Sequence, residues 1–126
     1  MIFVDTNVFM YAVGRSHPLQ EDARAFFQHH LGSGEVLVSS SEVLQELLHA
    51  YLPVGRLETL DHALVLARAR MANLWSVEPE DVELARSLAD AHPALGARDL
   101  IHFACCARRG VTRAKTYDRP LAAAFG

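Results

Sequence analysis

The chain has 126 residues, of which 51% are hydrophobic, and its formal net charge is −3. We therefore expect one domain over residues 1–126 with a substantial core, and the composition excludes a disordered chain. The negative charge excludes nucleic-acid binding by bulk electrostatic attraction, so any such binding must be local.

Targeting segments and cysteines give little further signal. The apolar runs are short and interrupted by Arg, His or Glu, so we expect no membrane span. The N-terminus lacks the basic region and cleavage site of a secretory signal, which favours a cytoplasmic protein. Cys105 and Cys106 are adjacent in an apolar stretch and fit neither a disulfide framework nor a zinc site. We expect both to be buried as small hydrophobic residues.

Short strands are expected to alternate with helices along the whole chain. In order, the predicted elements are a strand at 2–4, helices at 7–13 and 18–31, a strand at 36–38, helices at 39–51 and 57–74, a strand at 75–77, helices at 79–89 and 97–109, a strand at 111–116 and a terminal helix after 118. This alternation predicts an α/β fold with a mainly parallel central sheet of about four short strands flanked by helices.

Four acids lie near the predicted carboxyl ends of strands or in the helices that follow them: Asp5, Glu46, Asp99 and Asp118. In open α/β sheets ligands bind at that edge, so the four side chains are candidates for one site. Each acid also has a simpler explanation. The three aspartates could be N-caps of helices, and Glu46 could be a solvated helix residue.

Helical geometry separates the two glutamates of the third predicted helix. Ser39 and Glu42 form a capping-box pattern, and Glu42 falls nearly opposite the apolar stripe. Glu46 falls at the margin of that stripe. Glu46 is therefore the better ligand candidate, and Glu42 is assigned to the cap.

Clustered carboxylates repel one another, so a fold keeps them together only where a cation compensates their charge. Hard oxygen ligands favour Mg²⁺ or Mn²⁺ over zinc. The seven histidines show no paired ligand spacing. His102 shares a helix face with Asp99, and we expect it to be a packed residue of the interior.

Four motifs, in order along the chain, resemble those of PIN-domain nucleases, most closely the VapC type of toxin from toxin–antitoxin pairs. They are Asp5-Thr6-Asn7, Ser39-Ser40 followed by Glu46, Asp99-Leu100-Ile101-His102 and Thr116-Tyr117-Asp118. The resemblance implies that Asp5, Glu46, Asp99 and Asp118 are catalytic and bind Mg²⁺ or Mn²⁺. Asn7 and Thr116 match supporting polar positions.

The same resemblance implies cleavage of single-stranded or loop RNA by hydrolysis, with water activated by the cation attacking the phosphorus in line. Arg98, Arg113 and Lys115 are the candidate phosphate contacts. The implied partner is a small antitoxin that covers the cleft, and homodimerisation is a further possibility. The helices carrying Phe26-Phe27 and Leu47-Leu48 could form the groove for either partner, although those side chains fit a core equally well.

Two other functions remain open. The chain could be a PIN-like binding module that has lost its activity and uses the acids as caps. It could also be an Asp-nucleophile phosphatase, which likewise begins with a strand ending in Asp. That chemistry normally needs a second Asp two residues later and a Lys further on, whereas position 7 is Asn and the only lysine is Lys115.

Overall fold

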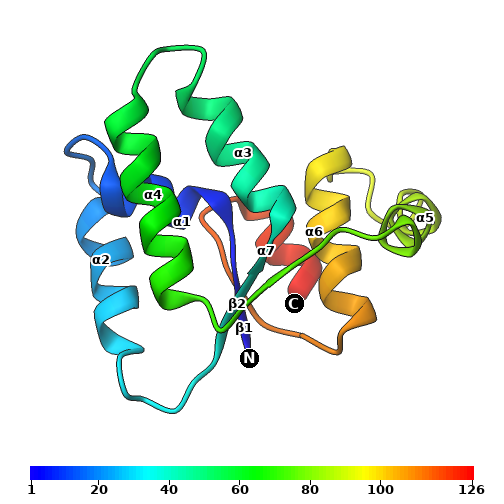
Figure 1. Ribbon diagram of the computed structural model, residues 1–126. Helices are drawn as coiled ribbons and strands as arrows, with labels where there is room; N and C mark the ends of the chain where they lie inside the picture. The colour runs from blue at the N-terminus through cyan, green and yellow to red at the C-terminus, as the bar shows by residue number, and fades with distance from the viewer.

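A computed structural model describes residues 1–126 as a four-stranded sheet with seven helices packed around it (Figure 1). The strands are β1 (Ile2–Val4), β2 (Leu37–Ser40), β3 (Asn73–Trp75) and β4 (Ala114–Lys115). The helices are α1 (Thr6–Val13), α2 (Gln20–His29), α3 (Ser41–Tyr51), α4 (Leu57–Arg70), α5 (Pro79–Leu88), α6 (Ala97–Arg108) and α7 (Arg119–Phe125).

The strands are arranged in the order β3-β2-β1-β4, and every neighbouring pair is parallel. Strand β1 is central, and its three residues are fully apolar and buried, as a strand covered on both faces requires. Because all four strands run in the same direction, their carboxyl ends meet at one edge, here called the carboxyl edge. The prediction of an α/β fold with a parallel sheet of about four strands is confirmed.

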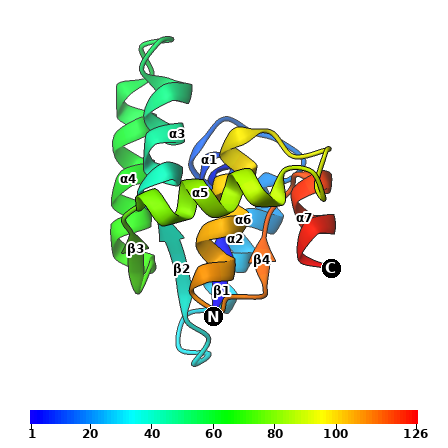
Figure 2. The ribbon, with the colours of Figure 1, turned by 90° about the vertical axis from the view of Figure 1, so that its right-hand side faces the viewer.

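The helices form a layer on each side of the sheet. Helices α1, α2 and α4 lie on one side and α6 and α7 on the other, with α5 outermost beyond α6 (Figure 1). Figure 2 shows α5 crossing the outer face of α6. The main core includes Phe3, Phe9, Val38 and Leu47, all fully buried. A second, smaller core contains Leu100 and other residues of α5, α6 and α7.

The predicted capping box at Ser39 is wrong. Ser39 lies within β2, and its Oγ donates to the Val4 carbonyl oxygen at 2.9 Å. Ser40 is the N-cap of α3, although its side chain makes no capping hydrogen bond. Strand β2 is paired on both sides, and this pairing holds the backbone extended for longer than the local capping preference would allow.

Pairing with β2 also moves the boundary between α4 and β3. The sequence predicted a helix to about residue 74 and a strand at 75–77. Instead α4 ends at Arg70, and the Ala72 amide donates to the Leu37 carbonyl oxygen at 2.8 Å. Asn73 then lies opposite Val38 in the ladder. None of the helices has the length and hydropathy that a membrane crossing would require.

Candidate active site

All four acids singled out in the sequence line one pocket at the carboxyl edge. Its volume is about 340 Å³, and its ten lining residues are Asp5, Thr6, Asn7, Met10, Glu46, His49, Ala50, Arg98, Asp99 and Asp118. They come from the ends of β1 and β4 and from α1, α3 and α6. The chain segments are far apart in sequence, and the parallel sheet is what brings them together.

Asp5 is the innermost acid of this acidic pocket, with only 4% of its surface exposed. It follows β1 and is the N-cap of α1, because its Oδ1 accepts a hydrogen bond of 2.8 Å from the Thr6 amide. Burial raises the pKa of the Asp5 carboxyl, against the opposing effect of His102 and of the hydrogen bonds from Thr116 and Thr6. The cap role and the pocket position therefore coexist at one residue.

Asn7 and Thr116 form a hydrogen-bonded chain that ends on Asp5. The Thr116 hydroxyl donates to Asp5 Oδ2 at 2.6 Å and accepts from the Asp118 amide at 3.0 Å. Asn7 Nδ2 donates to the same hydroxyl at 3.5 Å, and Asn7 Oδ1 accepts from the Tyr117 amide at 3.2 Å. The segment after β4 is thus fastened to α1, and Thr116 fixes the orientation of the Asp5 carboxylate.

Glu46 points from the second turn of α3 toward Asp5. Its Oε1 accepts a hydrogen bond of 3.0 Å from the Thr6 hydroxyl and contacts His102 Nε2. His102 is fully buried on α6, and its Nε2 also lies 3.7 Å from Asp5 Oδ1. Burial opposes charging of the ring, but the hydrogen bond and charge of Glu46, together with Asp5, raise the pKa of His102 above its usual value.

Asp99 and Asp118 complete the acidic lining. Asp99 lies in the first turn of α6, whose N-cap is Gly96, so the interpretation of Asp99 as an N-cap is wrong. Burial and the negative charges of Asp5 and Asp118 raise the pKa of Asp99 to about 6. Asp118 does cap a helix, because its Oδ2 accepts from the Leu121 amide at 3.2 Å at the start of α7.

The donor set fits a metal ion. One carboxylate oxygen each of Asp5 and Glu46 and one ring nitrogen of His102 lie within 4.8 Å of one another. Arg98 is the only Lys or Arg side chain that lines the pocket, and its Nε lies 3.9 Å from Glu42 instead of contacting the four acids. One buried acid and three half-buried acids, with no Lys or Arg paired to them, indicate a place for a divalent cation.

The other two candidate phosphate contacts lie outside this pocket. Arg113 Nη1 is 2.5 Å from Glu35 Oε1, and Lys115 Nζ is 3.0 Å from Asp22 Oδ2. Arg98 is therefore the one basic candidate that the fold places beside the acids.

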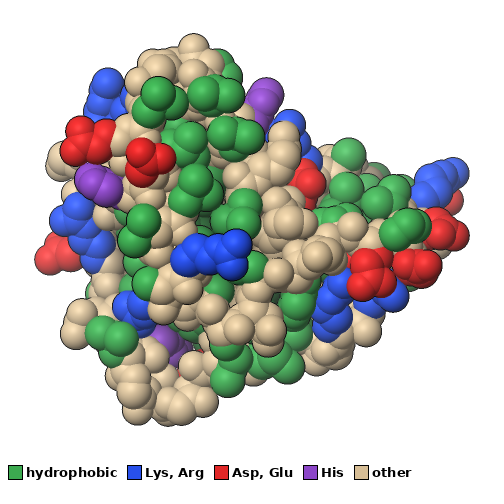
Figure 3. All heavy atoms as spheres, in the orientation of Figure 1, with side chains coloured by type: hydrophobic (Ala, Val, Ile, Leu, Met, Phe, Trp, Pro, Cys, Tyr) green, Lys and Arg blue, Asp and Glu red, His purple; other side chains and the backbone are tan.

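Acidic residues of α5 and its N-cap pair with basic residues at the end of α6. Arg108 and Arg109 reach across from α6 to Asp81 of α5 at 2.7 and 2.8 Å, and both lie near Glu78. Acidic and basic side chains accordingly lie next to one another around α5 (Figure 3). Two segments of opposite charge neutralise each other because α5 packs on α6. Cys105 and Cys106 are buried as expected, and burial raises the pKa of Cys105 to about 12.

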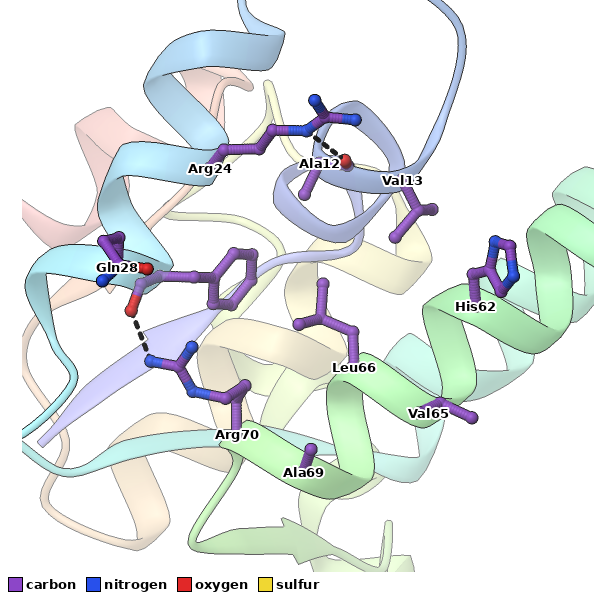
Figure 4. A pocket seen from close by; sticks show the side chains of 10 residues that line it. Ala12, Val13, Arg24, Gln28, His62, Val65, Leu66, Ala69 and Arg70 are labelled. Carbon is purple, nitrogen blue, oxygen red and sulfur yellow. Dashed lines mark hydrogen bonds between the residues drawn. The ribbon is translucent and has the colours of Figure 1, made fainter.

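An apolar groove lies between α2 and α4, on the side of the sheet opposite α6 and α7 (Figure 4). Its volume is about 550 Å³, and its ten lining residues are Ala12, Val13, Arg24, Phe27, Gln28, His62, Val65, Leu66, Ala69 and Arg70. None of them is acidic, so the groove cannot hold a cation in the same way. Phe27 is buried as part of the core, whereas Val65 is 66% exposed.

The sequence analysis did not assign Thr6 and His102 to the site. Both contact Glu46, and His102 also approaches Asp5. The available signal for His102 was its position three residues after Asp99, which puts both side chains on one face of α6. That spacing gave no indication of which distant residue the ring would meet.

Comparisons with known proteins agree with this architecture. The family model of the PIN domain matches residues 2–124. Ribonuclease VapC23 of Mycobacterium tuberculosis is 62% identical over 125 residues, which cover 99% of this chain and 98% of that protein. Ribonuclease VapC13 of the same species is 39% identical over 119 residues, covering 94% and 91%.

A solved structure shares the fold. The crystal structure of Mycobacterium tuberculosis VapC20, described as a sarcin-ricin loop cleaving toxin, superposes with a TM-score of 0.82. It covers 98% of this chain and 95% of the other, at 20% sequence identity. The resemblance drawn from the four sequence motifs is confirmed: the chain belongs to the PIN domain family.

Proposed function

We propose that this protein is a metal-dependent endoribonuclease that cleaves single-stranded or loop RNA and acts as the toxin of a toxin–antitoxin pair in the cytoplasm. The supporting observation is the pocket that gathers Asp5, Glu46, Asp99 and Asp118. His102 is the only basic side chain paired with any of these carboxylates. The ribonuclease relatives and the PIN fold favour RNA as the substrate.

We assign the four acids to holding Mg²⁺ or Mn²⁺, because carboxylate oxygens are the ligands that these ions prefer. A bound divalent ion would acidify water and neutralise charge on the phosphate. The chain's own residues set the geometry: Thr116 holds Asp5, and Thr6 holds Glu46. We assign Arg98, the one Lys or Arg side chain that lines the pocket, to binding a phosphate of the RNA.

Hydrolysis by water makes a specific prediction about the products. Each cut leaves a 5′-phosphate and a 3′-hydroxyl, since the 2′-hydroxyl of the RNA does not act as the nucleophile. The test is to incubate the purified protein with a looped RNA in Mn²⁺ or EDTA and to determine the chemistry of the ends. Cleavage of a phosphate monoester but not of RNA would instead support the phosphatase, and Mn²⁺ binding without cleavage would support the inactive module.

The antitoxin is the second part of the proposal, and we place its docking at the apolar groove of Figure 4. The groove has an apolar floor with Arg24 and Arg70 at its margin and no acid. An amphipathic helix that carries acidic residues beside its apolar face complements such a surface. A Val65→Asp variant should keep RNA cleavage but escape neutralisation by the cognate antitoxin, whereas Val82→Asp on α5 should remain neutralised.

A further inference from the structure

His102 stands out because it is a fully buried, polar residue whose two ring nitrogens have very different surroundings. Nε2 faces two carboxylates, contacting Glu46 Oε1 and lying 3.7 Å from Asp5 Oδ1. Nδ1 is buried without any hydrogen-bond partner. The ring is fixed by packing against Phe3, with the ring centroids 5.3 Å apart.

These surroundings determine where the proton lies. A nitrogen that faces two carboxylate oxygens must carry a proton, because a lone pair there would face two negative charges. The opposite tautomer would also bury an Nδ1–H group with no acceptor. A histidine that binds a metal normally donates its other ring N–H to an acceptor, and His102 has none available on that side.

We propose that His102 is not a metal ligand but a positioning residue that, together with Thr6, holds Glu46 by one oxygen and turns the other toward the pocket. Both donors meet the same atom, Oε1, while no hydrogen bond from the chain reaches Oε2. A carboxylate fastened by one oxygen presents its other oxygen in a fixed direction. This inference rests on the proposed function for its consequence, but the proton position follows from the contacts alone.

The proton position can be tested without metal or RNA. Heteronuclear NMR of protein labelled at histidine, in EDTA at alkaline pH, should show a hydrogen bound to Nε2 of His102. Finding Nε2 without a proton and Nδ1 with one would overturn the proposal. The same spectrum after Mg²⁺ addition should keep the Nε2 proton, because a ligand nitrogen would have lost it.

The positioning role is tested by Mn²⁺ affinity, measured by calorimetry. His102→Leu should weaken binding about tenfold or more, and His102→Gln, which keeps an N–H donor at a similar distance, should recover most of it. Thr6→Val and Thr6→Ser form a second matched pair, because the Thr6 hydroxyl donates to the same Glu46 oxygen. This pair tests the positioning role if the His102 variants fold poorly. If wild type binds Mn²⁺ and all four variants bind it equally well, the positioning role fails while the nuclease stands. If wild type binds no Mn²⁺, the proposed function itself fails.

Discussion

Two regions of this molecule bury aspartates, and they treat the charge in opposite ways. Asp81 is completely buried and accepts hydrogen bonds from Arg108 and Arg109. These hydrogen bonds outweigh the effect of burial and hold the pKa of the Asp81 carboxyl far below its usual range. Asp5 is almost as deeply buried, yet its close donors are neutral, and burial raises its pKa.

The difference separates a structural charge from a functional one. The arginines balance the Asp81 carboxylate from within the chain, so this cluster joins α5 to α6 and requires nothing else. The acidic pocket gathers four acids, and its one histidine pairs with only two of them, Glu46 and Asp5, which leaves negative charge for an external cation to balance. Asp81 and Asp5 are buried to nearly the same extent, so burial alone would not distinguish the two regions.

The largest effect should come from Asp5→Asn. The amide oxygen can still cap α1 through the Thr6 amide, but it is a much weaker metal ligand. We expect RNA cleavage to fall about a thousandfold, roughly 4 kcal/mol of lost transition-state stabilisation. Initial rates in Mn²⁺ measure this, with Asp22→Asn, an exposed acid beside Lys115, as the control. If Asp5→Asn keeps full activity, Asp5 serves only as the N-cap of α1.

Removing the charge at Asp81 should instead damage the fold. Asp81→Ala leaves two arginines without their buried partner, and we expect the free energy of unfolding to fall by about 3–5 kcal/mol. Urea titration followed by circular dichroism measures the loss. Glu83→Ala, an exposed acid on the same helix, should change stability by about 0.5 kcal/mol or less. Equal stability of the two variants would contradict the structural assignment of Asp81.

The dependence on pH should differ between the metal-free and the metal-bound protein. The pKa of Asp99 is about 6 in the folded protein against 3.8 in the unfolded chain, so between those values the folded state binds more protons. Stability without metal should therefore fall as pH rises through this window. Melting temperatures in EDTA test this, and Asp99→Asn should flatten the curve. Added Mn²⁺ should stabilise the wild type most at the higher pH, because protons compete with the metal.

The smallest effects should distinguish the basic residues. Arg98→Gln should raise KM for RNA about fivefold, near 1 kcal/mol for one charge-assisted phosphate contact. Arg113→Gln should leave KM within about twofold, since an exposed ion pair contributes little. Steady-state kinetics at two salt concentrations measure both. A larger effect at Arg113 would place the RNA path over β4 instead of the rim of the acidic pocket.

The sequence predicted the parallel sheet and the four pocket acids because both follow from local patterns repeated in chain order. Contacts between distant segments were harder to foresee. The capping box at Ser39 failed because strand pairing on both sides of β2 overrode a local preference. The pairing of Asp81 with Arg108 and Arg109 depends on how α5 lies across α6, which no local pattern encodes. His102 was read as a core residue, and its burial is correct, but its contact with Glu46 depends on the packing of α6 against α3.

The acidic pocket joins residues from opposite ends of the chain, with Asp5 fastened to Thr116. During synthesis on a ribosome, Asp5 is made early and cannot bind Thr116 until almost all of the chain has been made. A growing chain therefore has no assembled pocket until its last segments emerge and fold. A chain that ends before Thr116 accordingly lacks the hydroxyl that fixes the Asp5 carboxylate, and with it the complete acidic pocket.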